Sequence, residues 1–223
     1  FLLNSPQHPW IRASAYTDSS VFQTVAMMME HGYFPYKDSF DHKGPLIYLY
    51  NYWGRQIDTY CGIWYVEFAS LLVTFIALYK LARLSRISTL QSVITVFTTI
   101  SLMYRYFEGG NFTEEYAMPF IAISLFIFID YFLNGTISRI RLIICGACFA
   151  AVLLLRPNMT ACWIVFCLAV LIQTLASKLY KKLVFYLIWF ICGLSIVMLP
   201  ILIWMAKNGF LSDFWDAYIV FNM

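Results

Sequence analysis

The sequence predicts an all-α fold, a polytopic bundle of transmembrane helices with further helices lying along the outer membrane surface. Hydrophobic residues make up 61% of the 223 residues and charged residues only 12%, whereas soluble domains carry about 25% charged residues. The hydrophobic residues form several separate runs that approach the roughly 20 residues a helix needs to cross a bilayer. The net charge of +3 is small and spread along the chain, so we expect membrane lipid as a partner and no nucleic acid.

Six hydrophobic runs are expected to be membrane spans. The periodicity places them at residues 62–79, 89–107, 116–133, 142–155, 159–176 and 183–206. The sequence begins without a methionine and ends within a hydrophobic stretch. We therefore interpret residues 1–223 as one transmembrane domain, an N-terminal excerpt of a longer protein that lacks the first helix and the C-terminal part.

The connections between these runs alternate in charge. Eight of the 15 basic residues fall in three alternate connections that contain no acidic residue: Lys80, Arg83, Arg86, Arg139, Arg141, Lys178, Lys181 and Lys182. By the positive-inside rule these connections are cytoplasmic. The outward connections then hold ten of the 12 acidic residues: Asp18, Glu30, Asp38, Asp41, Asp58, Glu108, Glu114, Glu115, Asp213 and Asp216. We expect a multi-pass protein of the bacterial cytoplasmic membrane.

Residues 4–61 form a long outer segment that is expected to contain two surface helices. Hydrophobic residues at positions 21, 22, 25, 28 and 29 repeat at helical spacing, which predicts an amphipathic helix over 18–31 that ends at Gly32. Residues 45–57 are aromatic and too short to span, so we expect an interfacial helix, where Tyr and Trp are favoured. Long ordered loops are commonly functional, so this segment is the expected catalytic loop.

Asp18 lies at the start of the first surface helix. One interpretation is structural, because aspartate is a good helix N-cap. The other is chemical, with the carboxylate held at the membrane surface as a base. The two roles are compatible, since one carboxylate oxygen can cap the helix while the other faces a cleft.

The most informative stretch is GYFPYKDSFDHKGPL over residues 32–46. Pro45 suits the first turn of a helix, and Gly44 allows the backbone to approach a ligand closely. Lys43 then lies at the N-terminus of the second surface helix, and a cation beside free backbone N–H groups suits a phosphate. His42 and Asp41 can tune or orient that group. A solvated turn is the alternative interpretation.

An acidic residue, a surface helix, the pattern GYxPYxDxxDHKGPL and an aromatic helix follow one another in this sequence. This arrangement resembles the ArnT-like and protein O-mannosyltransferase branch of the GT-C glycosyltransferases, over residues 14–85 closely and over the later spans more loosely. The resemblance implies a GT-C-like fold and transfer of a sugar from a polyprenyl-phosphate donor to a cell-envelope acceptor. It also implies that Asp18 is the catalytic base and that Lys43 contacts the lipid phosphate.

The second outer loop reads RYFEGGNFTEEY over residues 105–116. Members of the resembled branch often carry another acidic residue here, so Glu115 and Glu114 are candidate catalytic residues and Glu108 is a third position. The alternative is that Thr113 caps the next helix and the two acids favour its N-terminus. The two glycines allow this loop to fold back toward the first outer segment.

Two arginines are further candidates for substrate binding. Arg105 belongs to the second outer loop, and Arg156 precedes Pro157, which breaks the helix between two hydrophobic runs. Either arginine can hold a lipid phosphate, although Arg156 can instead reach the lipid headgroups. A divalent ion, Mg²⁺ or Mn²⁺, between Asp18 and Glu115 stays open, since both offer oxygen ligands.

Two other functions stay open at this point. A transporter or lipid flippase is expected to carry paired charges or broken helices near mid-membrane, whereas these spans are nearly free of charge and the polar groups collect on outer loops. A noncatalytic scaffold of the same fold is the second alternative. We expect surface chemistry: in-line attack by an acceptor hydroxyl, with Asp18 removing its proton and Lys43 stabilising the departing phosphate.

Overall fold

The computed structural model describes residues 5, 7–10, 17–103, 106 and 109–222, and the described part of the chain contains helices and no strand. The helices are α1 (Thr17–Glu30), α2 (Pro45–Ile57), α3 (Gly62–Leu84), α4 (Thr89–Met103), α5 (Thr113–Asn134), α6 (Arg139–Leu153), the 3₁₀ turn η2 (Pro157–Thr160), α7 (Ala161–Ala176), α8 (Tyr180–Lys207), α9 (Leu211–Phe214) and the π-helical η3 (Trp215–Val220). The predicted all-α class is confirmed.

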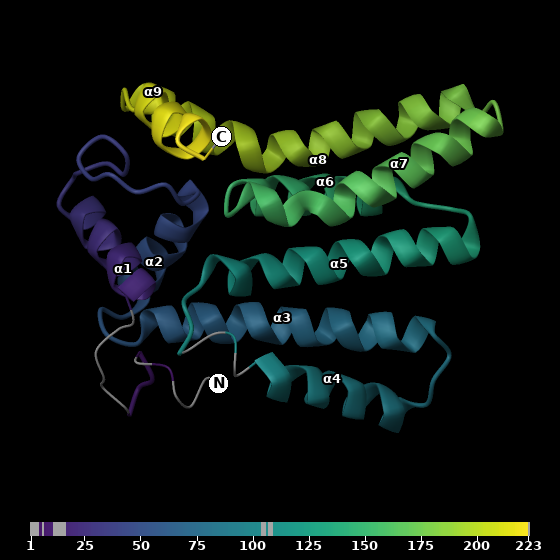
Figure 1. The fold of residues 1–223 in the computed structure, drawn as a ribbon, viewed down its shortest axis with the longest axis horizontal. Helices are drawn as coiled ribbons and strands as arrows, with labels where there is room; N and C mark the ends of the chain where they lie inside the picture. The colour runs from purple at the N-terminus through teal and green to yellow at the C-terminus, as the bar shows by residue number, and fades with distance from the viewer. Residues whose placement is uncertain (1–4, 6, 11–16, 104–105, 107–108, 223) are drawn as a thin grey trace.

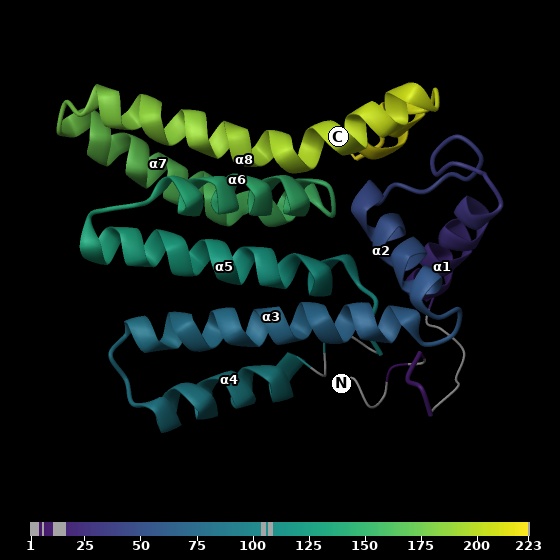
Figure 2. The same cartoon turned by 180° about the vertical axis from the view of Figure 1, so that it is seen from behind.

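Helices α3 to α8 lie side by side as an up-and-down bundle, and α1, α2 and α9 gather at one end of it (Figures 1 and 2). The connections between α3 and α4, α5 and α6, and α7 and α8 lie together at the opposite end. These connections carry the three basic groups of the sequence. The bundle therefore has one basic end and one end that holds the long first segment, as the alternation of charge predicted.

Four helical stretches are long and apolar enough to cross a membrane: Gly62–Leu84, Thr113–Asn134, Pro157–Ala176 and Tyr180–Lys207. The two remaining predicted spans form shorter helices. Helices α4 and α6 have 15 residues each, which corresponds to roughly 22 Å of helix against a hydrocarbon core of about 30 Å. The predicted end of the span 89–107 lies outside the described residues.

Close contact between α6 and α8 depends on two glycines. A Cβ atom on Gly146 would lie 2.0 Å from the carbonyl oxygen of Phe190, and one on Gly193 would lie 2.0 Å from that of Ile143. Because real Cβ atoms do not approach so closely, only glycine permits this separation of the two helices. The contact buries the middle of α6, including Cys145, Gly146 and Cys148.

The two helices predicted within residues 4–61 form as α1 and α2, which pack against each other. Gly32 ends α1 in the left-handed conformation with φ +87°, and Pro45 occupies the first turn of α2. The Arg55 guanidinium donates hydrogen bonds of 3.0 and 2.8 Å to the Glu30 carboxylate, which joins the ends of the two helices. Asp18 lies in the first turn of α1, which begins at Thr17.

Candidate functional site

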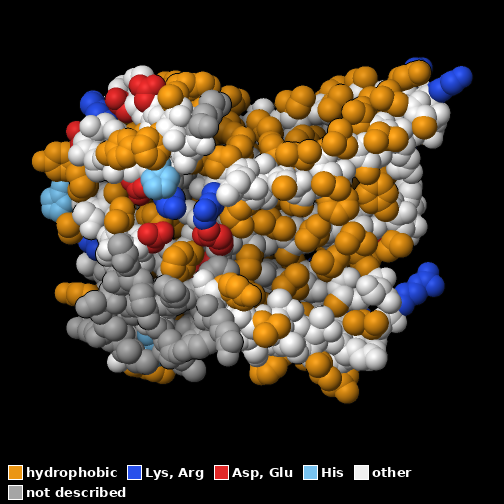
Figure 3. Space-filling model, in the orientation of Figure 1, with side chains coloured by type: hydrophobic (Ala, Val, Ile, Leu, Met, Phe, Trp, Pro, Cys, Tyr) orange, Lys and Arg blue, Asp and Glu red, His pale blue; other side chains and the backbone are white. Residues whose placement is uncertain are grey.

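Charged side chains are unevenly distributed over the molecule. Figure 3 shows acidic, basic and histidine side chains gathered where α1 and α2 meet the bundle, while the bundle itself presents a largely hydrophobic surface. In Figure 3, basic side chains otherwise stand at the far end of the bundle. The polar end is built from the loop before α2, the loop before α5, the segment after α6 and the segment that follows α8.

The start of α2 is joined directly to the end of α6. The backbone N–H of Gly44 donates to the carbonyl of Leu155 at 3.3 Å, and that of Leu46 donates to the carbonyl of Leu154 at 3.2 Å. Gly44 is required here, because an added Cβ would lie 2.0 Å from the Leu154 oxygen. Our expectation that free N–H groups at this helix start hold a phosphate is therefore wrong for Gly44 and Leu46, since both donate to protein carbonyls.

Lys43 is the cation that this junction positions. Its carbonyl accepts a hydrogen bond of 2.7 Å from the Tyr36 hydroxyl, which fixes the backbone. Its side chain is partly exposed, and within the described residues it forms no ion pair. An anion that reaches this point thus meets a positive charge not already neutralised by a carboxylate.

Asp41 and His42 lie beside Lys43 in the same loop. Asp41 Oδ1 accepts the His42 backbone N–H at 2.7 Å and lies 3.5 Å from His42 Nδ1. Asp41 Oδ2 is buried and receives no hydrogen bond from the described residues.

Two buried tyrosines lie near Asp41. Burial and then the Asp41 charge raise the pKa of Tyr48 well above its usual value. Burial, followed by nearby tyrosines and Asp41, does the same to the pKa of Tyr36. Both phenols therefore stay protonated at neutral pH.

The segment after α8 closes over this loop. The Tyr218 hydroxyl donates to the Leu153 carbonyl at 2.7 Å, and the Asn222 side-chain amide donates to the His42 carbonyl at 3.0 Å. The ring of Phe221 lies 5.6 Å from that of His42. These contacts leave no local signal in the sequence, because they join residues 65 and 180 positions apart.

Arg156 and Glu114, which were proposed separately for phosphate binding and for catalysis, form an ion pair with each other. The Arg156 side chain is 38% exposed and that of Glu114 is 35% exposed, so the pair lies at the surface of the polar end. Each group partly neutralises the other. Arg105 and Glu108, the other candidates of the second outer loop, lie outside the described residues.

Asp18 and Glu115 occupy different environments. The Asp18 side chain is exposed, whereas Glu115 is fully buried and its Oε2 accepts the Asn111 backbone N–H at 2.9 Å. None of the described contacts joins Asp18 to Glu115 or to Lys43. The proposed divalent ion between Asp18 and Glu115 stays a prediction. Thr113, predicted as the N-cap of α5, is its first residue, and Phe112 holds the cap position.

Asn111 is the centre of a buried polar network that sequence analysis did not identify. Its side-chain amide donates to Ser19 and to Asn51, each at 2.8 Å, and its side-chain oxygen accepts from Asn51 at 3.0 Å and from the Tyr116 hydroxyl at 3.2 Å. This network docks the second outer loop against α1 and α2, as the glycine pair before Asn111 predicted. The sequence signal for this network is Asn51, a polar residue within the otherwise aromatic and apolar first part of α2.

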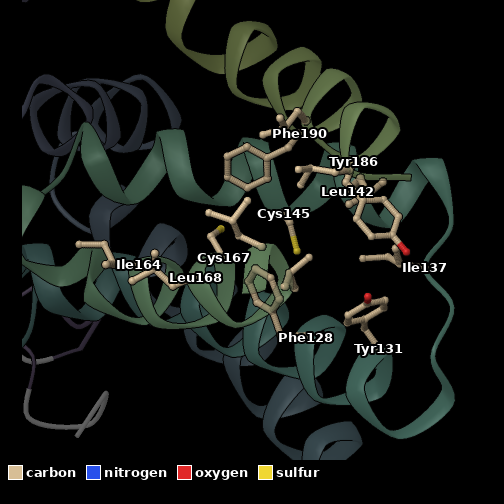
Figure 4. Close-up of a pocket in the computed structure, with 14 residues that line it drawn as sticks. Phe128, Tyr131, Ile137, Leu142, Cys145, Ile164, Cys167, Leu168, Tyr186 and Phe190 are labelled. Atoms are coloured by element: carbon tan, nitrogen blue, oxygen red, sulfur yellow. The ribbon is translucent and has the colours of Figure 1, made fainter. Parts of the chain in front are cut away.

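The described residues also line two mostly apolar hollows. A groove of about 820 Å³ is lined by residues of α8, α9, η3 and the end of α6; they are mostly apolar, such as Leu154 and Met198, but include Asp216. It therefore adjoins the junction that positions Lys43. A second pocket, of about 450 Å³, lies between α5, α6, α7 and α8 (Figure 4). Its lining is apolar apart from the hydroxyls of Tyr131 and Tyr186, which point toward each other in Figure 4, and it contributes no charged group to chemistry.

The described part of the chain is thus an all-helical bundle in which four helical stretches are long and apolar enough to span a membrane, and charged side chains gather at the end where α1 and α2 meet the bundle (Figures 1 and 3). The chain belongs to the family described as "Putative competence-induced protein Ccs4 N-terminal domain", whose model matches residues 10–223. No curated protein and no solved structure matches the chain.

Proposed function

We propose that this chain is the membrane-embedded part of a glycosyltransferase that takes a sugar from a polyprenyl-phosphate carrier and passes it to a cell-envelope acceptor. The observation that carries the proposal is Lys43, a partly exposed cation with no ion-pair partner in the described part of the chain. It precedes the first turn of α2, where the N–H of Leu46 donates to the carbonyl of Leu154, a residue that lines a mostly apolar groove. The likeness of residues 14–85 to GT-C enzymes supplies the reaction class.

Membrane insertion is supported by the outer surface of the bundle. The most hydrophobic 18-residue window of α8 is only 6% buried, and that of the η2–α7 stretch is 17% buried. Hydrophobic side chains such as Phe97, Ile172 and Ile196 are exposed. Soluble monomers rarely expose contiguous apolar patches larger than a few hundred Å². We therefore place the bundle in the bacterial cytoplasmic membrane, with its basic end inside and its polar end outside.

The groove beside the junction suits the hydrocarbon tail of the carrier. Leu154 lines the groove, and its carbonyl accepts the N–H of Leu46 in the first turn of α2. Lys43 precedes that turn, so a prenyl chain in the groove brings its phosphate toward the ammonium group. Burial raises the pKa of Tyr218, which also lines the groove, and Arg156 lies close enough to this hydroxyl to lower its pKa in part, but the charge of Arg156 is partly neutralised by Glu114.

The proposed reaction needs one base and one phosphate ligand. An acceptor hydroxyl attacks the anomeric carbon, its oxygen forms the new glycosidic bond, and the bond from that carbon to the phosphate oxygen breaks. Asp18, whose carboxylate is exposed at the polar end, takes the hydroxyl proton. Lys43 stabilises the negative charge that develops on the departing lipid phosphate, while Asp41 orients His42 beside it.

Complementation of a deletion strain tests this proposal. Envelope glycans are measured by mass spectrometry in cells that lack the gene and in cells that carry the full-length wild type, Lys43→Ala, Asp18→Asn or Lys37→Ala. Lys37 is an exposed lysine of the same loop, so Lys37→Ala is the matched control. We expect the wild type and Lys37→Ala to restore a missing glycan.

We expect Lys43→Ala to lose activity on the order of 10²–10³-fold, the usual effect of removing one group that stabilises transition-state charge. Membrane abundance of each variant is measured in parallel by immunoblotting. Unchanged glycans after deletion of the gene, or full complementation by Lys43→Ala at normal abundance, would contradict the proposal.

A further inference from the structure

Two carboxylates are buried together beneath the polar end. Glu67 projects from α3 and Glu115 from α5, two helices that pack against each other, and both side chains are 0% exposed. The two carboxylates lie against consecutive residues of one loop, Glu67 against Gly110 and Glu115 against Asn111. Neither forms an ion pair with a basic residue of the described ranges. Burying two unpaired negative charges side by side is strongly unfavourable unless something compensates them.

Each carboxylate has one oxygen that is satisfied and one that is not. Glu67 Oε2 accepts a hydrogen bond of 3.2 Å from the Ser5 hydroxyl, and Glu115 Oε2 accepts the Asn111 backbone N–H at 2.9 Å. The Oε1 atoms of both residues are buried and receive no hydrogen bond from the described residues. Buried polar atoms are normally bonded, so two such atoms in one place indicate a ligand that the described residues do not supply.

The loop before α5 brings these two groups together. A Cβ atom on Gly110 would lie 2.4 Å from Glu67 Oε1, so this oxygen packs directly against the glycine. The next residue, Asn111, holds Glu115 through its backbone N–H. Gly110 and Asn111 both have positive φ, +99° and +62°, a conformation that shapes the loop around the two carboxylates.

We propose that Glu67 and Glu115 hold a hard divalent cation, Mg²⁺ in the cell, between their unpaired oxygens. Oxygen-only ligands select hard cations, and Mg²⁺ typically takes one or two carboxylates and keeps several waters. The described residues contain no group of three or more His, Cys, Asp or Glu side chains suited to a metal, which argues against a closed structural zinc site. The Ser5 hydroxyl and the Gln7 side-chain oxygen, 3.2 Å apart, supply neutral oxygens beside Glu67.

This cation has a structural role that is independent of sugar transfer. It joins α3, α5 and the loop before α5, and Asn111 passes that constraint to Ser19 of α1 through its side-chain hydrogen bond of 2.8 Å. It differs from the ion considered between Asp18 and Glu115, because Glu67 replaces the exposed Asp18 as the second ligand. The start of α1, which carries Asp18 and Ser19, is thus held in place by Asn111.

Mn²⁺ binding to the purified full-length protein tests the site directly. The protein is purified in detergent, treated with EDTA and titrated with MnCl₂ while free Mn²⁺ is followed by electron paramagnetic resonance. We expect about one Mn²⁺ per chain, competition by MgCl₂ and a higher melting temperature with either salt than with KCl of equal ionic strength. Because this measurement needs no sugar donor, its result is independent of whether the protein is a glycosyltransferase.

The variants Glu67→Gln and Glu115→Gln keep the size of each side chain and remove its charge. We expect each to weaken Mn²⁺ binding by at least about tenfold, since even outer-shell partners of a metal contribute 10–100-fold, and to abolish the effect of MgCl₂ on melting. Glu30→Gln, which removes an acid paired with Arg55, is the control and keeps wild-type binding.

Two results would overturn the cation site. One is wild-type protein that binds no Mn²⁺ and melts at the same temperature with and without EDTA, which would mean that a shared proton compensates the pair. The other is Glu67→Gln and Glu115→Gln protein that binds Mn²⁺ as the wild type does. If either variant does not fold, the number of Mn²⁺ ions bound per wild-type chain decides by itself whether the cation site exists.

Discussion

Replacing Gly44 by alanine tests the junction between α2 and the segment after α6. The new Cβ would lie 2.0 Å from the Leu154 oxygen, 2.5 Å from its carbonyl carbon and 2.8 Å from the Leu155 oxygen. All three are backbone atoms, which cannot rotate away as a flexible side chain can, so the two segments must separate. The hydrogen bonds from Gly44 and Leu46 to these carbonyls, 3.3 and 3.2 Å long, are then lost.

The expected cost of Gly44→Ala follows from these contacts. Overpacking costs about 1–3 kcal/mol, and each lost hydrogen bond about 0.5–1.5 kcal/mol. Their sum, roughly 2–6 kcal/mol, is a large share of the stability of an ordinary domain. For a chain of this size each kcal/mol lowers the melting temperature by about 2–4 °C, so we expect a decrease of at least roughly 4 °C in detergent.

Gly135→Ala is the matched control for Gly44→Ala. Gly135 has φ +71° and no atom within 4 Å of the added Cβ, so alanine there meets only conformational strain of about 1–2 kcal/mol. Gly44 has φ −69° and meets only the steric clash. Melting is followed by intrinsic fluorescence in the same detergent. If Gly44→Ala melts at or above the temperature of Gly135→Ala, the junction between α2 and α6 is not as close as described.

Two further substitutions test the packing that supports the site. Asn111→Ala removes the side-chain hydrogen bonds of the buried network and places alanine at φ +62°, and we expect about 3–5 kcal/mol of destabilisation by denaturant titration. Asn134→Ala, which removes one exposed contact to Asp130, should change stability by less than about 0.5 kcal/mol; equal effects would show that the network contributes little. Gly146→Val forces α6 away from the α8 backbone and should lower the melting temperature through an overpacking cost of about 1–3 kcal/mol, and an unchanged melting curve would contradict the close contact of the two helices.

Local signals in the sequence predicted much of the helical framework. Positions 21, 22, 25, 28 and 29 gave the amphipathic face of α1, Gly32 gave its end, and Pro45 gave the start of α2. Pro157 correctly indicated the break between α6 and α7. These features depend on neighbouring residues, because helix periodicity and the backbone preferences of glycine and proline act over a few positions.

The candidate site was only partly accessible from the sequence. The proximity of Asp41, His42 and Lys43 follows from their being consecutive, but the ion pair between Arg156 and Glu114 joins residues 42 positions apart. Glu67 lies within a predicted span and carried no predicted role, and Glu115 was expected in an outer loop. In the structure both are buried, and the loop before α5 lies against both carboxylates.

The sequence by itself determined the helical class, the gathering of the basic connections at one end of the bundle (Figure 1), and the two helices within residues 17–57, because each of these follows from local hydrophobic pattern and charge. Only the tertiary structure decided which polar groups compensate one another. It showed that the first N–H groups of α2 donate to the end of α6, that Lys43 has no ion-pair partner within the described ranges, and that Glu67 and Glu115 are buried together. Such pairings depend on how distant helices pack, because a charge is neutralised by whatever lies within a few ångströms of it and not by its neighbours along the chain.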